Sequence, residues 1–285
     1  MSTWTVITVT FNSRAHLERH WLQRDRSFHW IVVDNQSADG TVDLAREVAD
    51  EVVVLPENVG FSRANNVGLS RVASPYVAFV NPDVSVPPLR EWGGRFAELI
   101  DDYGALVGPQ LTYGDGSVQP NARGLPYLGA KVGNRLRPQS ARGREYARAE
   151  FQVPTFCAWL MGAAVAGATD SVRGLGGWDE RYFLYYEDHD LGLRAWRSGV
   201  PVIIDPRVNW VHEWQRETTS LNTRAWRREL QAMRHFYSEY PALLYPRSLR
   251  SNSRRLQRAG MKTIADNLWA RVPMASPNTR RDLST

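Results

Sequence analysis

The sequence predicts an α/β fold in which a mostly parallel central sheet is flanked by helices. The first hundred residues repeat one pattern: a short β-branched run, a polar or Gly-containing turn, and a helix-like stretch. The length of 285 residues allows one domain of about 200–250 residues with an appendage. No uncharged apolar run reaches the roughly 18 residues that span a bilayer. We therefore expect one large folded domain that does not cross a membrane.

Four buried runs are expected to form parallel strands. They are Thr5–Thr10, Trp30–Asp34, Val52–Leu55 and Tyr76–Val80. Ligands of an open α/β sheet bind beyond the carboxyl ends of the strands, so the residues after each run are candidates for a site. Polar residues stand at all four places: Asn12 and Ser13, Asp34 to Thr41, Asn58 to Phe61, and Asn81 to Asp83. Four strand ends are thus predicted to converge on one edge.

The second half of the chain has a weaker pattern. A buried run at Ala105–Val107 precedes residues 112–153, whose many Gly, Pro, Arg and Tyr residues predict a long loop or lid. An apolar stretch at Cys157–Ala168 and a Gly-rich turn lead to an acidic cluster, Glu187-Asp188-His189-Asp190. The elements expected next are a helix at about Asp190–Ser198 ended by Gly199, strands at Val200–Ile204 and Val208–Val211, and a helix at Thr223–Tyr240 ended by Pro241 and Pro246. The acidic cluster is thus expected at the N-terminus of a helix.

Charge separates the body of the chain from its C-terminal segment. Residues 247–285 hold nine Lys and Arg against two Asp and Glu, a net +7, whereas residues 1–246 hold 26 against 28, a net −2. We therefore expect a domain at 1–246 and a basic helical tail at 247–285. The single cysteine, Cys157, excludes an internal disulfide, and no secretory leader pattern is visible, so a cytoplasmic location is expected.

Carboxylates at the strand ends indicate nucleotide and metal binding. Asp34 and Asp39 stand where a carboxylate can accept hydrogen bonds from a base or a ribose, although Asp39 also fits a cap before Gly40-Thr41. Asp83 fits an anchor for a divalent cation, Mg²⁺ or Mn²⁺, that neutralises a leaving diphosphate. Taken alone, Asn81-Pro82-Asp83 is equally an ordinary turn.

Taken together, six segments resemble family 2 glycosyltransferases with the GT-A fold, notably bacterial rhamnosyl- and galactofuranosyltransferases of cell-surface glycan assembly. The resemblance covers roughly residues 3–240. The segments are Thr8 to Ser13, Val33 to Thr41, Asn58 to Gly68, Val80 to Asp83, Gly177 to Glu180, and Tyr186 to Leu191 with Arg194. Their order and spacing are specific only in combination. Asn81 replaces the first aspartate of the Asp-x-Asp triplet found in many relatives, which implies weaker metal affinity.

The resemblance implies a nucleotide-binding half at 1–110 and an acceptor-binding half at 111–246. The nucleotide-binding residues that it implies are Thr10, Asn12, Asp34, Asp39, Asn58 and Asn81. It implies a metal and diphosphate site at Asp83. His212 would complete that site, as a downstream histidine does in similar galactofuranosyltransferases, whereas a lone histidine is otherwise a packing residue.

The resemblance also assigns a catalytic pair. Inverting transfer needs a general base near the acceptor hydroxyl. Asp188 is assigned as this base and Glu187 as the residue that orients the acceptor. The clustered charges should raise some of the pKa values, while the helix N-terminus acts in the opposite direction. Asp190 is expected to be structural, as a helix cap or as the partner of Arg194.

Trp178 and Asp179 resemble a turn that contacts the acceptor in the family, and core packing is the alternative reading of both. The activity implied is the transfer of a sugar, with rhamnose from dTDP-rhamnose as first choice, to a saccharide or lipid-linked acceptor. Galactofuranosyl, glucosyl and mannosyl transfer remain alternatives. A nucleotidyltransferase or a non-catalytic nucleotide-sugar binding module is the rival class, although residues 11–16 lack the glycines of a phosphate loop.

The basic tail suggests contact with an anionic membrane. Six basic residues, from Arg247 to Lys262, precede a stretch in which Ile264, Leu268, Trp269 and Val272 recur at helical spacing. This pattern predicts an interfacial anchor with Trp269 at the headgroup level, on the inner face of the cell membrane. A polar tail or an oligomer contact is the alternative. Binding of nucleic acid is a minor expectation, because the body of the chain is mildly acidic.

Overall fold

The computed structural model describes residues 2–137, 140, 143, 146–213, 223–244 and 252–273. Pro246, Arg247 and Arg250 lie outside these residues. The strands are β1 (Trp4–Thr10), β2 (His29–Asp34), β3 (Glu51–Val54), β4 (Tyr76–Val80), β5 (Val84–Ser85), β6 (Leu106–Thr112), β7 (Val118–Gln119), β8 (Ala122–Arg123), β9 (Thr155–Phe156), β10 (Trp159–Leu160), β11 (Ala164–Ala168) and β12 (Val202–His212). The helices are α1 (Arg14–His20), α2 (Thr41–Val48), α3 (Phe61–Arg71), α4 (Leu89–Tyr103), α5 (Leu128–Leu136), α7 (Thr169–Gly174), α8 (Glu187–Arg197), α9 (Thr223–Glu239), the 3₁₀ turn η2 (Pro241–Leu244), α10 (Asn252–Arg258) and α11 (Lys262–Asn267).

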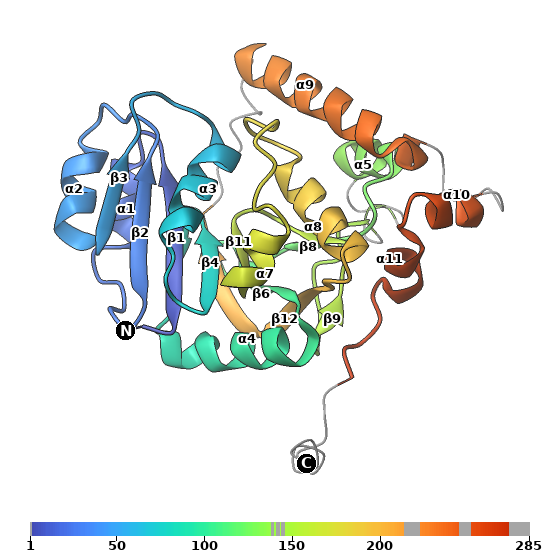
Figure 1. Cartoon of the computed structure of the whole chain (residues 1–285), viewed down its shortest axis with the longest axis horizontal. Helices are drawn as coiled ribbons and strands as arrows, with labels where there is room; N and C mark the ends of the chain where they lie inside the picture. Colours follow the sequence, from blue (N-terminus) through green and yellow to red (C-terminus); the bar gives the residue numbers. More distant parts are fainter. Residues whose placement is uncertain are drawn as a thin grey trace, which may run out of the picture.

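One large mixed sheet runs through the molecule in the strand order β3-β2-β1-β4-β11-β6-β12-β5 (Figure 1). β1 pairs in parallel with β2 and β4, and β12 pairs in parallel with β6. β11 is antiparallel to both β4 and β6 and so joins the two parallel groups. The prediction of a mostly parallel sheet between helices is therefore confirmed.

Alternate strand residues supply two apolar cores, one on each face of the sheet. On one face Ile7 and Phe79 pack with residues of α3 and α8. On the other face Val6 and Ala78 pack with residues of α1, α2 and α4, where Trp4 stacks edge-on against Trp92 with ring centroids 4.8 Å apart. The period of two along each strand thus fixes which helices cover which face.

The second half of the chain is more regular than its sequence pattern indicates. Residues 112–153, expected as a loop, include β7, β8 and the helix α5. The two strands expected at Val200–Ile204 and Val208–Val211 are one long strand, β12, whose pairing shifts register between Asp205 and Asn209. The helix expected from Asp190 begins at Glu187, so the acidic cluster forms its first turn. Gly199 follows this helix with φ +80°, a conformation that favours glycine.

The described part of the tail packs against the body. Met261 and Ile264 are fully buried in the same core as α8, and Val272 is 4% exposed in the other core. Trp269 packs on Phe151, with ring centroids 5.5 Å apart. The expectation that this apolar stripe enters a bilayer is therefore wrong, because the fold itself covers these side chains. No helix among the described residues is long and apolar enough to cross a membrane.

Candidate active site

A cavity of about 980 Å³ opens at the carboxyl ends of β1, β2 and β4. The loops after these strands form its donor side, named here after the donor that the sequence predicts. Helices α5, α8 and α9 contribute its acceptor side. Predicted residues from both halves of the chain meet in its lining: Asn12, Asn58, Asn81, Asp83, Glu187, Asp188 and His212. The convergence predicted from the strand ends is thus present in the structure.

Three predicted nucleotide ligands do not line the cavity but support its donor wall. Asp34 is fully buried, and its carboxylate accepts hydrogen bonds from the hydroxyl of Thr10 (2.8 Å) and from the backbone N–H of Ser37 (2.7 Å). Asp39 accepts from the backbone N–H groups of Thr41 (3.0 Å) and Arg14 (3.1 Å). Thr10 and Asp34 thus brace the loops from buried positions, whereas Asp39 is exposed and holds the start of the loop before α2.

Asn35 is a donor-side residue that the sequence analysis overlooked. Its side chain accepts from the backbone N–H of Val59 and donates to the carbonyl of Gly60, both at 3.2 Å, and so ties the loop after β2 to the loop after β3. Gly60 has φ +88°, and a Cβ atom there would lie 2.4 Å from the carbonyl oxygen of Phe183. Only glycine allows the chain leading to α8 to approach this closely.

Asp83 and His212 form a pair suited to a cation. Nε2 of His212 lies 3.4 Å from Oδ1 of Asp83, and both atoms are buried without a hydrogen-bond partner among the described residues. Nδ1 of His212 donates to Oε1 of Gln119 (2.6 Å), which fixes the ring with Nε2 facing the carboxylate. No third His, Cys, Asp or Glu joins them within the part of the chain that is described. The pair therefore fits a metal whose other ligands come from substrate and water.

Asp188 stands in the first turn of α8 with one oxygen engaged and one weakly held. Oδ1 accepts from the backbone N–H (2.8 Å) and from Nδ1 (2.6 Å) of His189, whereas Oδ2 accepts only a long 3.3 Å hydrogen bond from Gly162 among the bonds that the structure shows. Burial acts to raise the pKa of Asp188, but the contact with His189 and the positive charge of Lys131 outweigh burial, and the pKa is lowered. Asp188 is therefore ionised at neutral pH.

Glu187, next to Asp188, has a pKa shifted in the opposite direction. Its carboxyl group is buried, and its Oε2 atom has no hydrogen-bond partner among the described residues. Burial, followed by the negative charge of Asp188, raises the pKa of Glu187 well above its usual value. The pKa values of the two adjacent carboxyl groups are thus shifted in opposite directions, upward for Glu187 and downward for Asp188.

Lys131 and His189 extend a hydrogen-bonded chain behind Asp188. Nζ of Lys131 donates to Nε2 of His189 (2.8 Å), and the ammonium group lies 3.5 Å from the ring centre of Tyr186. The His189 ring also stacks on Trp159 at 3.6 Å. Burial lowers the pKa of His189 to about 4 and that of Lys131 to about 7. His189 is therefore neutral, with its single proton on Nδ1 directed at Asp188.

The backbone before α8 is strained. Tyr185 has φ +73° and Tyr186 has φ +71°, in the left-handed region that bulky residues rarely adopt. Each such residue costs on the order of 1–3 kcal/mol and persists only where the surroundings impose it. The strain turns the chain directly into the helix so that Glu187 and Asp188 face the cavity.

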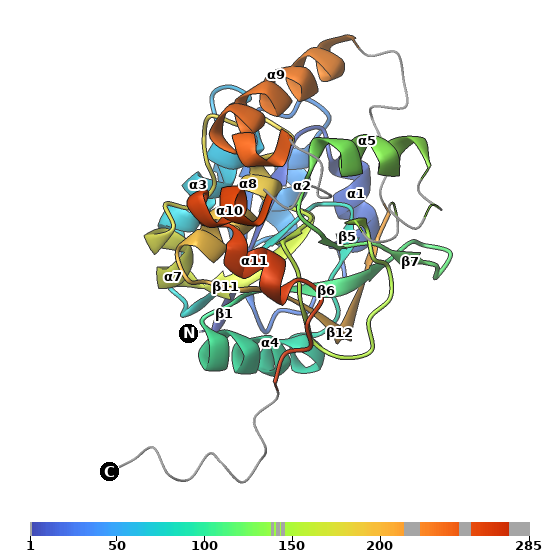
Figure 2. The same ribbon diagram turned by 90° about the vertical axis from the view of Figure 1, so that its right-hand side faces the viewer.

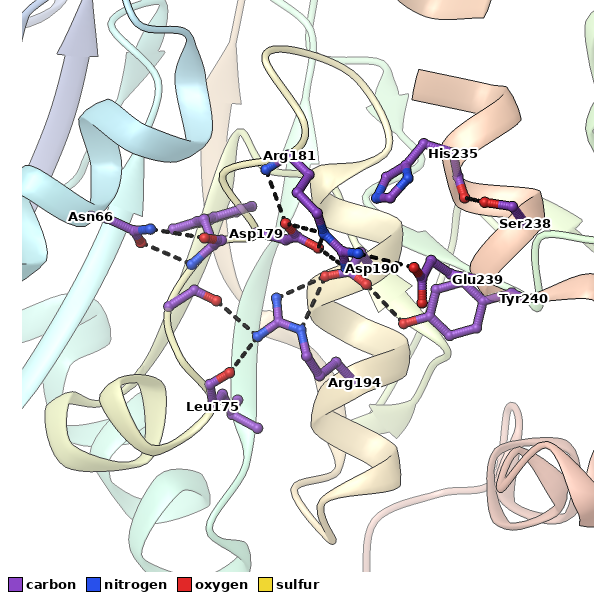
Figure 3. A network of polar contacts seen from close by, with 12 residues as sticks. Asn66, Leu175, Asp179, Arg181, Asp190, Arg194, His235, Ser238, Glu239 and Tyr240 are labelled. Atoms are coloured by element: carbon purple, nitrogen blue, oxygen red, sulfur yellow. Dashed lines mark hydrogen bonds and ion pairs between the residues drawn. The ribbon is translucent and has the colours of Figure 1, made fainter. Parts of the chain in front are cut away.

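Asp190 anchors α8 from the far side, as Figure 3 shows. Its carboxylate pairs with the guanidinium of Arg194 (2.8 Å) and accepts from the hydroxyl of Tyr240 on the chain after α9 (2.8 Å). Arg194 also donates to the carbonyl oxygens of Leu175 and Gly177. The structural role expected for Asp190 is therefore confirmed, since it joins α8, α9 and the Gly-rich turn.

Neither predicted acceptor contact lines the cavity. Trp178 is 1% exposed and packs edge-on against Phe61 and Phe79 in the core. Asp179 pairs with Arg181 at 2.6 Å (Figure 3). The turn thus positions neighbouring elements, and the expectation of an open Trp178 face for a sugar is corrected by its burial.

Several site residues were missed by the sequence analysis. His189 stood within the acidic cluster and could have been found from its position beside Asp188. Lys131 and Gln119 lie in the segment expected as a loop, where no periodicity marked them. Arg228, on α9, lines the cavity and was likewise unmarked.

The model of the family described as Glycosyl transferase family 2 matches residues 5–164, more than half of the chain. The chain belongs to this family. It is 30% identical over 237 residues to the N-acetylglucosaminyl-diphospho-decaprenol L-rhamnosyltransferase of Mycobacterium tuberculosis, and the match covers 73% of this chain and 75% of the relative. This glycosyltransferase therefore shares a family with a rhamnosyltransferase, and the rival class of nucleotidyltransferase or binding module is set aside.

Solved structures show the same fold. The mannosyltransferase PcManGT from Pyrobaculum calidifontis, in complex with GDP-Man and Mn²⁺, aligns with a TM-score of 0.56 at 18% identity, covering 93% of this chain and 73% of that one. S. aureus TarS in complex with UDP-GlcNAc aligns at 0.55 with 15% identity, covering 94% and 72%. GalNAc-T7 with UDP, GalNAc and Mn²⁺ aligns at 0.54 with 13% identity, and this chain spans 55% of its length. The GT-A fold predicted from the sequence is therefore confirmed.

Proposed function

We propose that this glycosyltransferase moves rhamnose from dTDP-rhamnose, with inversion, to a hydroxyl of a lipid-linked saccharide in cell-surface glycan synthesis. The choice of sugar and acceptor rests on the relative named as an L-rhamnosyltransferase acting on a diphospho-decaprenol. The observation that carries the reaction type is the ionised Asp188, held in a cavity that also contains the Asp83–His212 pair.

The donor would lie against the strand-end loops. Asn12, Asn58 and Asn81 line the cavity and offer amide groups to the nucleotide. Thr10, Asp34 and Asp39 would act indirectly by holding these loops in place. Rigid loops of this kind lower the cost of ordering a bound nucleotide.

A divalent metal, Mg²⁺ or Mn²⁺, would be held by Asp83 and His212. When bound, it would act as a Lewis acid that neutralises charge on the leaving diphosphate. Gln119 supports this assignment because it fixes the His212 ring from the opposite nitrogen. Structures of two fold neighbours contain Mn²⁺.

Asp188 would act as the general base. Its Oδ2 atom, which is weakly held, accepts the proton of the acceptor hydroxyl as the acceptor oxygen bonds to the anomeric carbon. The bond from that carbon to the diphosphate oxygen breaks on the opposite face, and the nucleotide diphosphate leaves with the electron pair. Glu187, whose raised pKa favours the protonated form, would orient the acceptor through a hydrogen bond.

The test is a screen of donor consumption with a diphospho-polyprenol-linked N-acetylglucosamine acceptor. dTDP-rhamnose should be consumed faster than UDP-galactofuranose, UDP-glucose or GDP-mannose, and NMR of the product should show an inverted anomeric carbon. Faster consumption of one of the other donors would replace rhamnose by that alternative. No transfer from any donor would contradict the proposed function.

A further inference from the structure

Exposed apolar side chains gather on two helices beside the cavity. Val132 and Leu136 on α5 are 49% and 75% exposed, and Trp226 and Leu230 on α9 are 37% and 50% exposed. They are four of the eight large apolar side chains that are exposed in the described part of the chain. We call these four residues the α5–α9 rim. None of the four lines the cavity, but both helices that carry them contribute other residues to its lining. Exposed apolar groups gathered in this way mark an interaction surface.

The two helices of the rim are joined to each other. The guanidinium of Arg135 lies 4.5 Å from the ring centre of Trp226 and is 3.1 Å from the carboxylate of Glu229. Figures 1 and 2 both show α5 beside α9, above the sheet and away from α4. Arg135 therefore links the two helices of the rim, which come from segments far apart in the sequence.

Cations lie between the rim and the proposed base. Along α5, Lys131 contacts His189 behind Asp188, and Arg135 stands one turn further, about 6 Å along the helix axis. From α9, Arg228 also lines the cavity, with its guanidinium held 4.1 Å from the ring centre of Phe183. The sequence of chemistries from outside to inside is thus apolar, then cationic, then the base.

We propose that the α5–α9 rim and its cations bind a polyprenyl diphosphate, with the hydrocarbon on the rim and the diphosphate at Arg135 and Arg228. This inference rests on the proposed function and locates the lipid end of the acceptor. A polyprenyl diphosphate sugar presents hydrocarbon, diphosphate and sugar, which match in turn the apolar rim, the cations that line the cavity, and Asp188. Guanidinium groups are well suited to diphosphate oxygens because they can donate two parallel hydrogen bonds.

The placement of the charges favours this ligand over a plain anionic bilayer. The described side chains of α5 and of α9 from Trp226 onward include five basic residues and two acidic ones. Three of the basic residues, Lys131, Arg135 and Arg228, line the cavity together with one acidic residue, Glu229, which pairs with Arg135. A flat bilayer would be contacted by cations on the outer surface. Cations that line the cavity instead fit a phosphate group that enters it.

The experiment is co-sedimentation with phosphatidylcholine vesicles that contain either undecaprenyl diphosphate or phosphatidylglycerol at equal surface charge. The wild-type chain should bind the first kind at least about tenfold more tightly. The double variant Leu136→Gln with Leu230→Gln should abolish that preference. Each substitution removes apolar contact with the hydrocarbon and should lower the affinity by up to about tenfold. Both side chains are exposed, so thermal unfolding of the variant should match that of the wild type.

Leu22→Gln with Val54→Gln is the matched control, because these side chains are 48% and 45% exposed and lie outside the cavity lining. This control should bind as the wild type does. Equal binding to both kinds of vesicle, or unchanged binding by the rim variant, would overturn the proposal. Calorimetric titration of wild-type protein with dTDP distinguishes failure of the lipid site from failure of the proposed function. Binding of dTDP without a preference for undecaprenyl diphosphate would refute the lipid site alone.

Discussion

The donor side and the acceptor side of the cavity hold their polar groups in different ways. In the loops of the donor side, neutral donors satisfy the carboxylate of Asp34, namely Thr10 and Ser37. On the acceptor side, ionisable groups contact one another, and the partly buried Lys131 and Asp188 form one chain with the buried His189. Hydrogen bonds between neutral and charged partners fix a shape, whereas coupled ionisable groups fix a protonation state. The first wall is thus suited to binding and the second to proton transfer.

The strongest test of this contrast is Asp188→Asn. Turnover should fall by on the order of 10²–10⁴-fold, because a base acts in the transition state, while calorimetric affinity for dTDP should stay near that of the wild type. Glu187→Gln is the matched variant and should keep more activity, since Gln resembles the protonated form that the raised pKa of Glu187 favours. If Asp188→Asn keeps more activity than Glu187→Gln, Glu187 is the base and Asp188 orients the acceptor.

Acid should destabilise the acceptor side through His189. Burial lowers its pKa to about 4 from an ordinary value of 6.5, so the unfolded chain binds a proton at a higher pH than the folded chain does. The free energy of unfolding should therefore decrease as pH falls from about 6.5 to about 4, by on the order of 3 kcal/mol from this residue.

Chemical denaturation at several pH values measures this slope. His189→Gln should be less stable at pH 7, because it loses the stacking on Trp159, but its stability should change less across the same window. A variant with the wild-type slope would show that other groups cause the acid sensitivity.

Asp83→Ala tests the donor side. Removing this carboxylate should weaken binding of dTDP in the presence of Mn²⁺ by about 10–100-fold, the size of effect that altered metal sites commonly show. The affinity should then equal that of wild-type protein in chelator. Asp170→Ala is the control, because that side chain is fully exposed and outside the cavity lining. If the wild-type protein binds dTDP equally well with Mn²⁺ and with chelator, the assignment of a metal to Asp83 is wrong.

The smallest effect on kcat at pH 7 is expected for Lys131→Met, so this variant is compared with the wild type over a range of pH. The charge of Lys131 lowers the pKa of Asp188, so its loss should move the acid limb of the kcat profile to higher pH. Burial sets the pKa of Lys131 itself to about 7, so the wild type loses this charge above pH 7 and the two profiles should converge there. Arg137→Met, which removes an exposed charge just beyond the same helix, should leave the acid limb in place. An unmoved acid limb in Lys131→Met would contradict the coupling.

The donor side was largely predictable because sheet topology places strand ends together. Asn58 and Asp83 follow directly from the alternation of strand and helix. The sequence could not show that Asp34 is saturated by Thr10 and Ser37, because that depends on side-chain rotamers.

The acceptor side was less predictable because helix packing creates it. Lys131 meets His189 only when α5, in a segment without clear periodicity, is placed against α8. The position of Ile264 in the core was missed for the same reason: an apolar stripe looks alike whether the fold or a bilayer covers it.

The antiparallel strand β11 has a consequence for synthesis on the ribosome. β4 is complete at Val80, yet the strand that covers its open edge begins only at Ala164. At about 5–20 residues per second, that edge waits on the order of ten seconds for its partner. β6 waits as well, since β11 and β12 both follow it in the chain. The nascent chain therefore carries unpaired strand edges, which are the surfaces that chaperones must shield from other nascent chains.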